Sequence, residues 1–177
     1  MKSKNSIPFF ITLISVTAAG PVAMQLYIPS VPAITKDFEV SLGVAQFAFS
    51  LSLITMAISM LFYGPLSDKY GRKQILIYGM ILFITGSIVS LVSNSIYILI
   101  FGRIIQSIGG AGGLVISRAI VRDIYGPKNA ARVLGTLITI FIAAPMIAVI
   151  IGGFISEYYG WRSVFVAYFF IGILILI

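Results

Sequence analysis

The chain has 177 residues, of which 59% are hydrophobic and 10% charged, with a mean hydropathy of +1.09. That composition excludes a water-soluble domain, which would have too little polar surface to cover its core, and predicts a membrane protein. The net charge of +7 comes in small clusters between apolar runs, which argues against nucleic-acid binding, and the lack of cysteine and histidine excludes disulfides and thiolate or imidazole metal sites.

Apolar segments alternate with short polar ones along the whole chain. A helix that crosses about 30 Å of hydrocarbon needs about 20 apolar residues, and five segments come close to that length, at residues 9–28, 45–64, 75–92, 96–116 and 133–155. A sixth, 164–177, reaches the last residue without a polar anchor, so we expect the sequence to stop inside a helix and to be a fragment. The first run is too long for a signal peptide. The expected fold is all-α, with six transmembrane helices.

The basic residues predict which ends of these segments face the cytoplasm. If the N-terminus is cytoplasmic, nine of the twelve lysines and arginines fall on the cytoplasmic side. Only Lys36 and Arg162 then lie outside, and Arg103 lies within a span. The positive-inside rule therefore predicts a cytoplasmic N-terminus. It also makes the stretch "GPLSDKYGRKQ", residues 64–74, a cytoplasmic loop.

A weak internal repeat relates the two halves of the sequence. A shift of 89 positions aligns "GPLSDKYGRK" (64–73) with "GFISEYYGWR" (153–162), and seven of the ten positions agree in kind. The first stretch is expected inside the cell and the second outside. Three-span units of opposite orientation are typical of secondary transporters, so the sequence predicts a 3+3 inverted repeat. Chance similarity between two glycine-containing turns is the alternative.

Several of these stretches resemble a known family. Residues 64–73 resemble the loop 2–3 signature of the major facilitator superfamily, and "RIIQSIGGAGG" (103–113) is similar to its fourth-helix motif, with Ser107 where glycine is usual. Together, "LYIPSVPAI", "SRAIVRDIY" and "GWRSVF" resemble drug:proton antiporters of the bicyclomycin/chloramphenicol-resistance type. The resemblance implies the N-terminal half of a twelve-helix transporter of the bacterial inner membrane, with a missing C-terminal six-helix half as its partner.

The sequence departs from that family pattern in two places. Gln25 stands where the drug-efflux type usually carries an acid in the first span. In the fifth span, Ala148 and Val149 occupy the place of a Gly-Pro pair before Gly152 and Gly153, although Pro145 is present one turn earlier. The first departure favours an uptake or uniport carrier as an alternative to proton exchange.

Arg103 is the sharpest candidate for a functional residue. An ionised side chain about seven residues inside a span is expensive and is expected to face a cavity or a partner. Gln106, one turn on, shares its face of the helix. We expect Arg103 to sense the binding of substrate or protons; the alternative is a side chain that reaches toward the outer membrane surface. On the first span, Met24, Gln25 and Tyr27 are expected to line a mostly apolar pocket.

Asp68 is the second candidate, because an acid among bases adds little to topology. We expect Arg118 and Arg122 to pair with it. The family resemblance implies a latch that holds the cytoplasmic side closed in one state; the alternative is a solvated turn that only sets topology. Gly64 and Gly71 are expected to let the second and third spans turn sharply and approach a neighbour closely, and Pro145 to kink the fifth span. The candidate gating residues are Gly64, Asp68, Gly71, Arg72, Arg118, Arg122, Pro145, Gly152 and Gly153.

The leading functional hypothesis is a secondary transporter that exports small lipophilic compounds in exchange for protons. The alternatives are metabolite uptake or uniport and a non-transporting membrane fragment. An enzyme is not expected, because the chain has no histidine, no cysteine and no acid pair within a span. No cofactor or metal is expected, and the expected partners are a small-molecule substrate, protons and the lipid bilayer.

Overall fold

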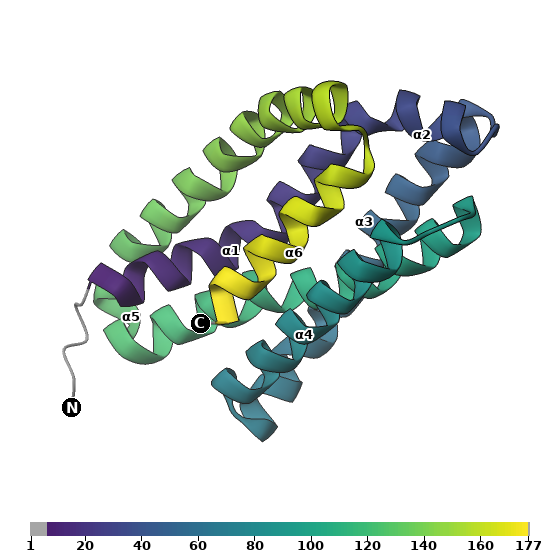
Figure 1. Cartoon of the computed structure of the whole chain (residues 1–177). Coiled ribbons are helices and arrows are strands. Elements are labelled where there is room, and N and C mark those ends of the chain that lie inside the picture. The colour runs from purple at the N-terminus through teal and green to yellow at the C-terminus, as the bar shows by residue number, and fades with distance from the viewer. Residues whose placement is uncertain (1–6, 177) are drawn as a thin grey trace.

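The computed structural model describes residues 7–176, and every regular element among them is helical (Figure 1). The elements are α1 (Ile7–Tyr27), η1 (Ile28–Ser30), α2 (Val31–Asp37), α3 (Leu42–Tyr70), α4 (Arg72–Leu91), α5 (Ile96–Tyr159) and α6 (Arg162–Leu176). The helix α5 breaks at Gly126, whose φ of +67° is not helical. We therefore call Ile96–Gly126 the first arm of α5 and Ala130–Tyr159 its second arm.

Five helical segments are long and apolar enough to cross a membrane. They are Phe9–Asp37, Leu42–Tyr70, Arg72–Leu91 and the two arms of α5, whereas α6 has 15 residues and is shorter than a full span. The segments run alongside one another as a bundle, with α1 beside α6 and the two arms of α5 on either side of α1 (Figure 1). The described chain is therefore an all-helical membrane bundle.

The stretch expected to be a loop, residues 64–74, is helical except at one residue. The helix α3 continues through Pro65 to Tyr70, and α4 begins at Arg72. Only Gly71 interrupts them, with a φ of +95° that favours glycine, so one residue reverses the chain. Between α5 and α6, Gly160 has a φ of +80° and the chain reverses over two residues, Gly160 and Trp161.

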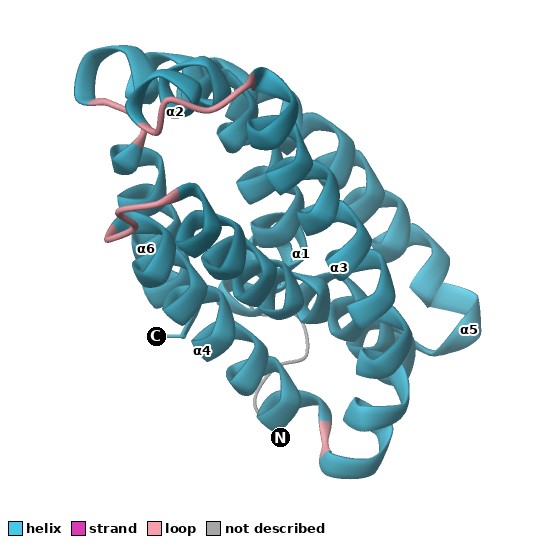
Figure 2. Ribbon diagram, turned by 90° about the vertical axis from the view of Figure 1, so that its right-hand side faces the viewer, coloured by secondary structure: helices cyan, strands magenta, loops and turns pink. Residues whose placement is uncertain are grey.

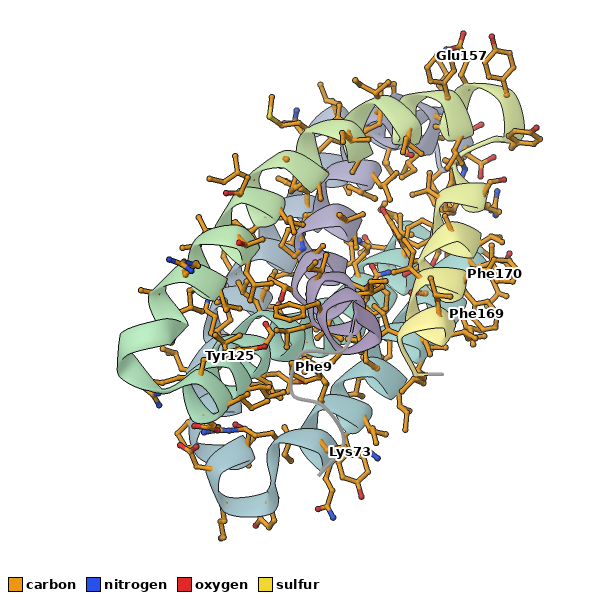
Figure 3. All side chains as sticks on the ribbon, turned by 90° about the vertical axis from the view of Figure 1, so that its left-hand side faces the viewer. Phe9, Lys73, Tyr125, Glu157, Phe169 and Phe170 are labelled. Carbon is orange, nitrogen blue, oxygen red and sulfur yellow. The ribbon has the colours of Figure 1, made fainter. Side chains whose placement is uncertain are left out.

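These two glycine turns lie at opposite ends of the bundle. Figure 3 places Lys73, next to the first turn, at one end and Glu157, next to the second, at the other. Short pink connections at both ends of the ribbon in Figure 2 mark such places where the chain turns. The polar residues around these two turns thus lie mostly in terminal helical turns rather than in extended loops.

The first arm of α5 forms the centre of the bundle. A Cβ atom on Gly109 would collide with the backbone carbonyl of Gly79 and the amide nitrogen of Phe83, so α4 and the first arm cross with their backbones in contact. Gly113 makes the same kind of contact with the Val16 carbonyl in α1. Lipid tails are as apolar as leucine, so the hydrophobic effect does not drive helices together inside a membrane. Close van der Waals packing does so instead, and small residues at the crossings permit it.

Aromatic side chains connect α6 to the rest of the bundle. Tyr168 is fully buried and donates its hydroxyl to the Ala23 carbonyl of α1 at 2.7 Å. Its ring packs edge-on against Phe165, which in turn contacts Tyr27 and Trp161. Such aromatic pairs stabilise a core beyond the area that they bury. The short helix α6 is thereby fixed against α1 and α4.

Candidate functional site

A buried arginine lies in the interior of the bundle. Arg103, in the first arm of α5, is 1% exposed. It donates to Gln106 Oε1 at 2.6 Å, and its guanidinium lies 4.5 Å from the centre of the Tyr27 ring. The predicted pair of Arg103 and Gln106 is therefore in direct contact, and the side chain is enclosed by protein, which contradicts the alternative of a side chain that reaches toward the outer surface.

Further contacts surround this arginine, but none comes from a carboxylate. Gln106 Nε2 donates to Ser87 Oγ of α4 at 2.8 Å, and Met24 Sδ of α1 accepts from Arg103 Nη2 at 3.5 Å. Within residues 9–126 and 130–176, every ion pair lies elsewhere in the bundle. Arg103 thus places an uncompensated positive charge inside the bundle, held by an amide, a thioether and an aromatic ring, where an isolated charge is costly.

An apolar hollow of about 450 Å³ lies between α1, α3 and the second arm of α5. Met24 and Gln25 line it, as the sequence predicts, whereas Tyr27 does not: its side chain is fully buried and donates to the Ala45 carbonyl at 3.3 Å. The full lining is Pro21, Met24, Gln25, Leu53, Met56, Phe141, Ile142, Pro145, Met146 and Val149. None of these ten residues is ionisable. The size and lining fit a small lipophilic molecule.

A second, much smaller cavity reaches the arginine. Its volume is about 10 Å³, and it is lined by Gly20, Ala23, Met24, Met56, Phe83, Arg103, Gln106, Ser107 and Gly110. Met24 and Met56 line both this cavity and the apolar hollow. The hollow and the arginine are therefore separated by two methionine side chains.

A charged cluster ties three helices together at the end of the bundle where α3 turns into α4. Arg72 forms an ion pair with Asp68 and a second one with Asp123 of α5, at 3.1 Å between Nε and Oδ2. It also donates to Ser67 Oγ at 2.5 Å. We call Asp68, Arg72, Asp123 and Ser67 the Arg72 cluster. Its acids lie on α3 and on the first arm of α5, so the cluster joins the end of α3, the start of α4 and the end of that first arm.

The prediction that Asp68 pairs with Arg118 and Arg122 is wrong. Asp68 pairs with Arg72, one helical turn away across Gly71, and in the described part of the chain no ion pair joins it to Arg118 or Arg122. Those two arginines are exposed and line a hollow of about 360 Å³ together with Asp68 and Arg72. The close spacing of Asp68 and Arg72 is set by the single-residue turn, which the prediction of a longer loop did not anticipate.

The other candidate gating residues divide into close contacts and open positions. Gly152 lies against α1, where an added Cβ would come within 2.6 Å of the Leu26 carbonyl oxygen. A Cβ added at Gly153 would have Pro29 Cβ as its nearest neighbour, at 3.9 Å. The prediction of a sharp turn and a close helix approach at Gly64 is wrong. Gly64 lies inside α3, and nothing lies within 4 Å of an added Cβ. Pro145 lines the hollow from the helical second arm, while Gly126 forms the break between the two arms of α5.

One polar cluster at the opposite end was not identified as a site from the sequence. Asp37 at the end of α2 accepts from Trp161 Nε1 at 3.1 Å and from Arg162 Nη1 at 2.7 Å. Arg162 also donates to the Ser93 carbonyl at 3.2 Å, and its guanidinium lies 4.2 Å from the Trp161 ring. The motif "GWRSVF" contained the signal, since it places tryptophan and arginine side by side after a glycine.

Met56 and Ser87 were also missed. Methionine and serine are common on apolar helices, and nothing in their spacing distinguishes these two from their neighbours. Their positions follow only from how α3 and α4 pack around the first arm of α5.

Comparison with known proteins identifies the family. The family model described as Major Facilitator Superfamily matches residues 12–177. A bicyclomycin resistance protein homolog of Haemophilus influenzae is 31% identical over 98% of the chain and 44% of its own length. The multidrug resistance protein D of Escherichia coli is 29% identical over 92% of the chain and 41% of its own length, and the multidrug resistance protein MdtL of Shigella flexneri is 32% identical over 95% and 43%.

The chain therefore spans less than half the length of these relatives. All three relatives are bacterial, and their names refer to drug resistance. With the family model matching nearly every residue and the structure providing the apolar helices, the chain belongs to the Major Facilitator Superfamily of transporters.

Proposed function

We propose that this chain is part of a secondary transporter that exports small, lipophilic compounds across a bacterial inner membrane by alternating access, in exchange for protons. The observation that carries the proposal is the hollow of about 450 Å³, lined by α1, α3 and the second arm of α5. Its lining of methionine, proline and aliphatic side chains suits ligands of varied shape, because methionine adapts its conformation at little cost. The names of the relatives support drugs as the substrates.

The same proposal includes the inverted repeat and the orientation. The turns at Gly71 and Gly160, which the shifted alignment pairs, both have positive φ and lie at opposite ends of the bundle (Figures 1 and 3), which supports two three-span units of opposite direction. With the N-terminus in the cytoplasm, the Arg72 cluster is cytoplasmic and the Asp37–Arg162 pair is outside. Rocking of this unit against a second one would open the hollow to each side in turn.

Transport into everted membrane vesicles tests the function. Vesicles from bacteria that express the protein should accumulate labelled bicyclomycin when the lumen is acidic, and lose the accumulation when the pH gradient is collapsed. Uptake that ignores the gradient would instead support uniport, the reading that Gln25 favours, because the hollow offers no acid to carry a proton. Absence of any transport by the full-length protein would refute the proposed function.

Arg103 is the residue whose loss should affect transport most. Arg103→Ala removes the buried charge of the small cavity next to the hollow, and we expect transport to fall at least tenfold at an equal membrane level of protein. The matched control is Arg132→Ala, which removes an exposed arginine from the second arm of α5. Equal transport by the two variants would exclude a role for Arg103.

We further propose that the Arg72 cluster is the latch of the cytoplasmic side. It joins three helix ends through one guanidinium, so loss of a partner should free them. In Asp68→Asn, we expect cytoplasmic accessibility of the hollow to rise, measured by labelling of a cysteine introduced at Phe141, which lines the hollow. Unchanged labelling and unchanged transport would show that the cluster only sets topology.

A further inference from the structure

Two flexible methionine side chains, Met24 and Met56, line both the apolar hollow and the small cavity at the buried arginine, and we call this pair the methionine wall. Both are buried, at 5% and 8% exposure. Methionine has three rotatable bonds and repacks easily, so these two side chains are the part of the shared lining best able to move and connect the two spaces. The remaining lining of the small cavity includes Gly20 and Gly110, which offer no side chain to refill it.

Behind this wall lie hydrogen-bond donors that the protein leaves unused. Arg103 Nε and Ser107 Oγ are both buried and have no hydrogen-bond partner among residues 9–126 and 130–176. Both residues line the small cavity. Buried polar atoms without a partner are rare in native proteins, and each one calls for an explanation. Two of them around one cavity indicate a place where a ligand atom can be received.

A third donor at this place is only weakly occupied. Arg103 Nη2 donates to Met24 Sδ at 3.5 Å. A thioether sulfur is a poor acceptor, so an oxygen atom in its place would form a stronger, charge-assisted bond. The movement of Met24 that opens the wall therefore also frees this donor for the ligand.

From these contacts we infer that the methionine pair covers a polar subsite, and that the preferred substrates are apolar molecules with one exposed oxygen acceptor, neutral or anionic. The apolar part occupies the hollow, and the acceptor passes between Met24 and Met56 to Arg103 and Ser107. Organic cations are disfavoured, because the charge at the subsite is positive and, in the described residues, no acid lines either space. The inference rests on the proposed function, and it specifies the substrate class.

A matched series of naphthalenes tests the preference. The full chain is reconstituted in lipid nanodiscs, and binding is measured for 1-acetonaphthone, 1-naphthoate, 1-ethylnaphthalene and 1-naphthylmethylammonium. The four share one ring system and differ in the group that would reach the subsite. We expect the ketone and the carboxylate to bind at least about tenfold more tightly than the hydrocarbon, as a hydrogen bond to a charged donor implies, and the ammonium ion to bind most weakly.

Substitutions locate the preference at the methionine wall. Met24→Ile replaces a flexible side chain by a β-branched one, and should bring the ketone and the hydrocarbon close to equal affinity. Met146→Ile is the matched control, because Met146 lines the hollow but not the small cavity. It should change all four affinities by a common factor and leave their order unchanged. Ser107→Ala, which removes one unused donor, should reduce the ketone preference by about three- to tenfold.

The outcomes separate this inference from the proposed function. If all four compounds bind equally well, or the ammonium ion binds best, the subsite is refuted while export of lipophilic compounds stands. If the ketone is preferred but Met24→Ile and Met146→Ile have the same effect, the subsite is not behind the methionine wall and the inference fails. If bicyclomycin is transported but none of the four compounds binds to the wild-type chain, the inference fails alone, and loss of both results refutes both proposals.

Discussion

The two arms of α5 are both apolar enough to span a membrane, yet they are used in opposite ways. In the most apolar stretch of the first arm, 61% of the residues are buried, against 11% in the second arm, although the second arm is the more apolar of the two. Hydropathy decides which segments enter the membrane but not which of them lies at the centre, because lipid solvates aliphatic side chains as well as protein does. The first arm is central because its glycines and polar groups require other helices around them.

The largest predicted difference between the arms comes from adding a side chain at a glycine. Gly109→Val in the first arm would force the valine into the backbone of Gly79 and Phe83, and we expect a loss of more than about 4 kcal/mol, enough to prevent folding. Gly135→Val in the second arm should be tolerated, since nothing lies within 4 Å of an added Cβ. Thermal unfolding in detergent, followed by the fluorescence of Trp161, measures both. Similar stability of the two variants would contradict the central position of the first arm.

A smaller but still large difference is expected when an isoleucine is truncated. Ile116 in the first arm is fully buried, so Ile116→Ala leaves a cavity and should cost about 2–5 kcal/mol of unfolding free energy. Ile150 in the second arm is 63% exposed, and Ile150→Ala should cost less than about 0.5 kcal/mol. Unfolding of each variant by increasing sodium dodecyl sulfate in mixed micelles gives the two values. Equal costs would mean that the second arm is covered in the same way as the first.

Two neighbouring glycines sharpen the comparison within the second arm itself. Gly152 touches the Leu26 carbonyl of α1, so Gly152→Ala should separate the two helices and cost about 1–3 kcal/mol. Gly153→Ala should change stability by less than about 0.5 kcal/mol, because its nearest neighbour is at ordinary contact distance. The midpoint of thermal unfolding distinguishes them. If Gly153→Ala were the more destabilising variant, the second arm would contact α1 through the face that carries Gly153 and not through the face that carries Gly152.

The smallest predicted effect concerns hydroxyl groups. Ser117 in the first arm accepts a hydrogen bond from Thr17 of α1 at 2.8 Å, so Ser117→Ala should cost about 1 kcal/mol. Thr139 in the second arm donates only within its own helix, to the Gly135 carbonyl at 3.1 Å, and Thr139→Val should be close to neutral. The same unfolding assay resolves the pair if each variant is measured in replicate. If Ser117→Ala left the free energy of unfolding unchanged, the hydrogen bond between Thr17 and Ser117 would make no net contribution to stability.

Part of the candidate site could be anticipated from single residues. An arginine within a span is costly enough that it must face a cavity or a partner, and Arg103 does face the interior with Gln106 one turn away. Met24 and Gln25 likewise line the hollow. Helical periodicity and the cost of a buried charge were sufficient in these cases, because both act within a few residues along one helix.

Predictions failed where they depended on the length of a connection. The polar stretch 64–74 was expected to be a loop, but it forms the ends of two helices around Gly71, and this brings Arg72 to Asp68 in place of Arg118 or Arg122. Glycine and proline near charged residues are typical of a loop, yet Pro65 is accommodated inside α3. A single left-handed residue can reverse the chain, and composition cannot reveal which glycine adopts that conformation.

The sequence by itself determined that this is a helical membrane protein of the Major Facilitator Superfamily, because hydropathy, segment length and family motifs are properties of the chain alone. Only the tertiary structure decided that Arg103 has no acidic partner in the described bundle and that Met24 and Met56 separate it from the hollow. Those facts depend on how α1, α3 and α4 pack around α5. In a membrane, that packing is chosen by close steric fit and polar contacts between distant segments, which leave little trace in local sequence.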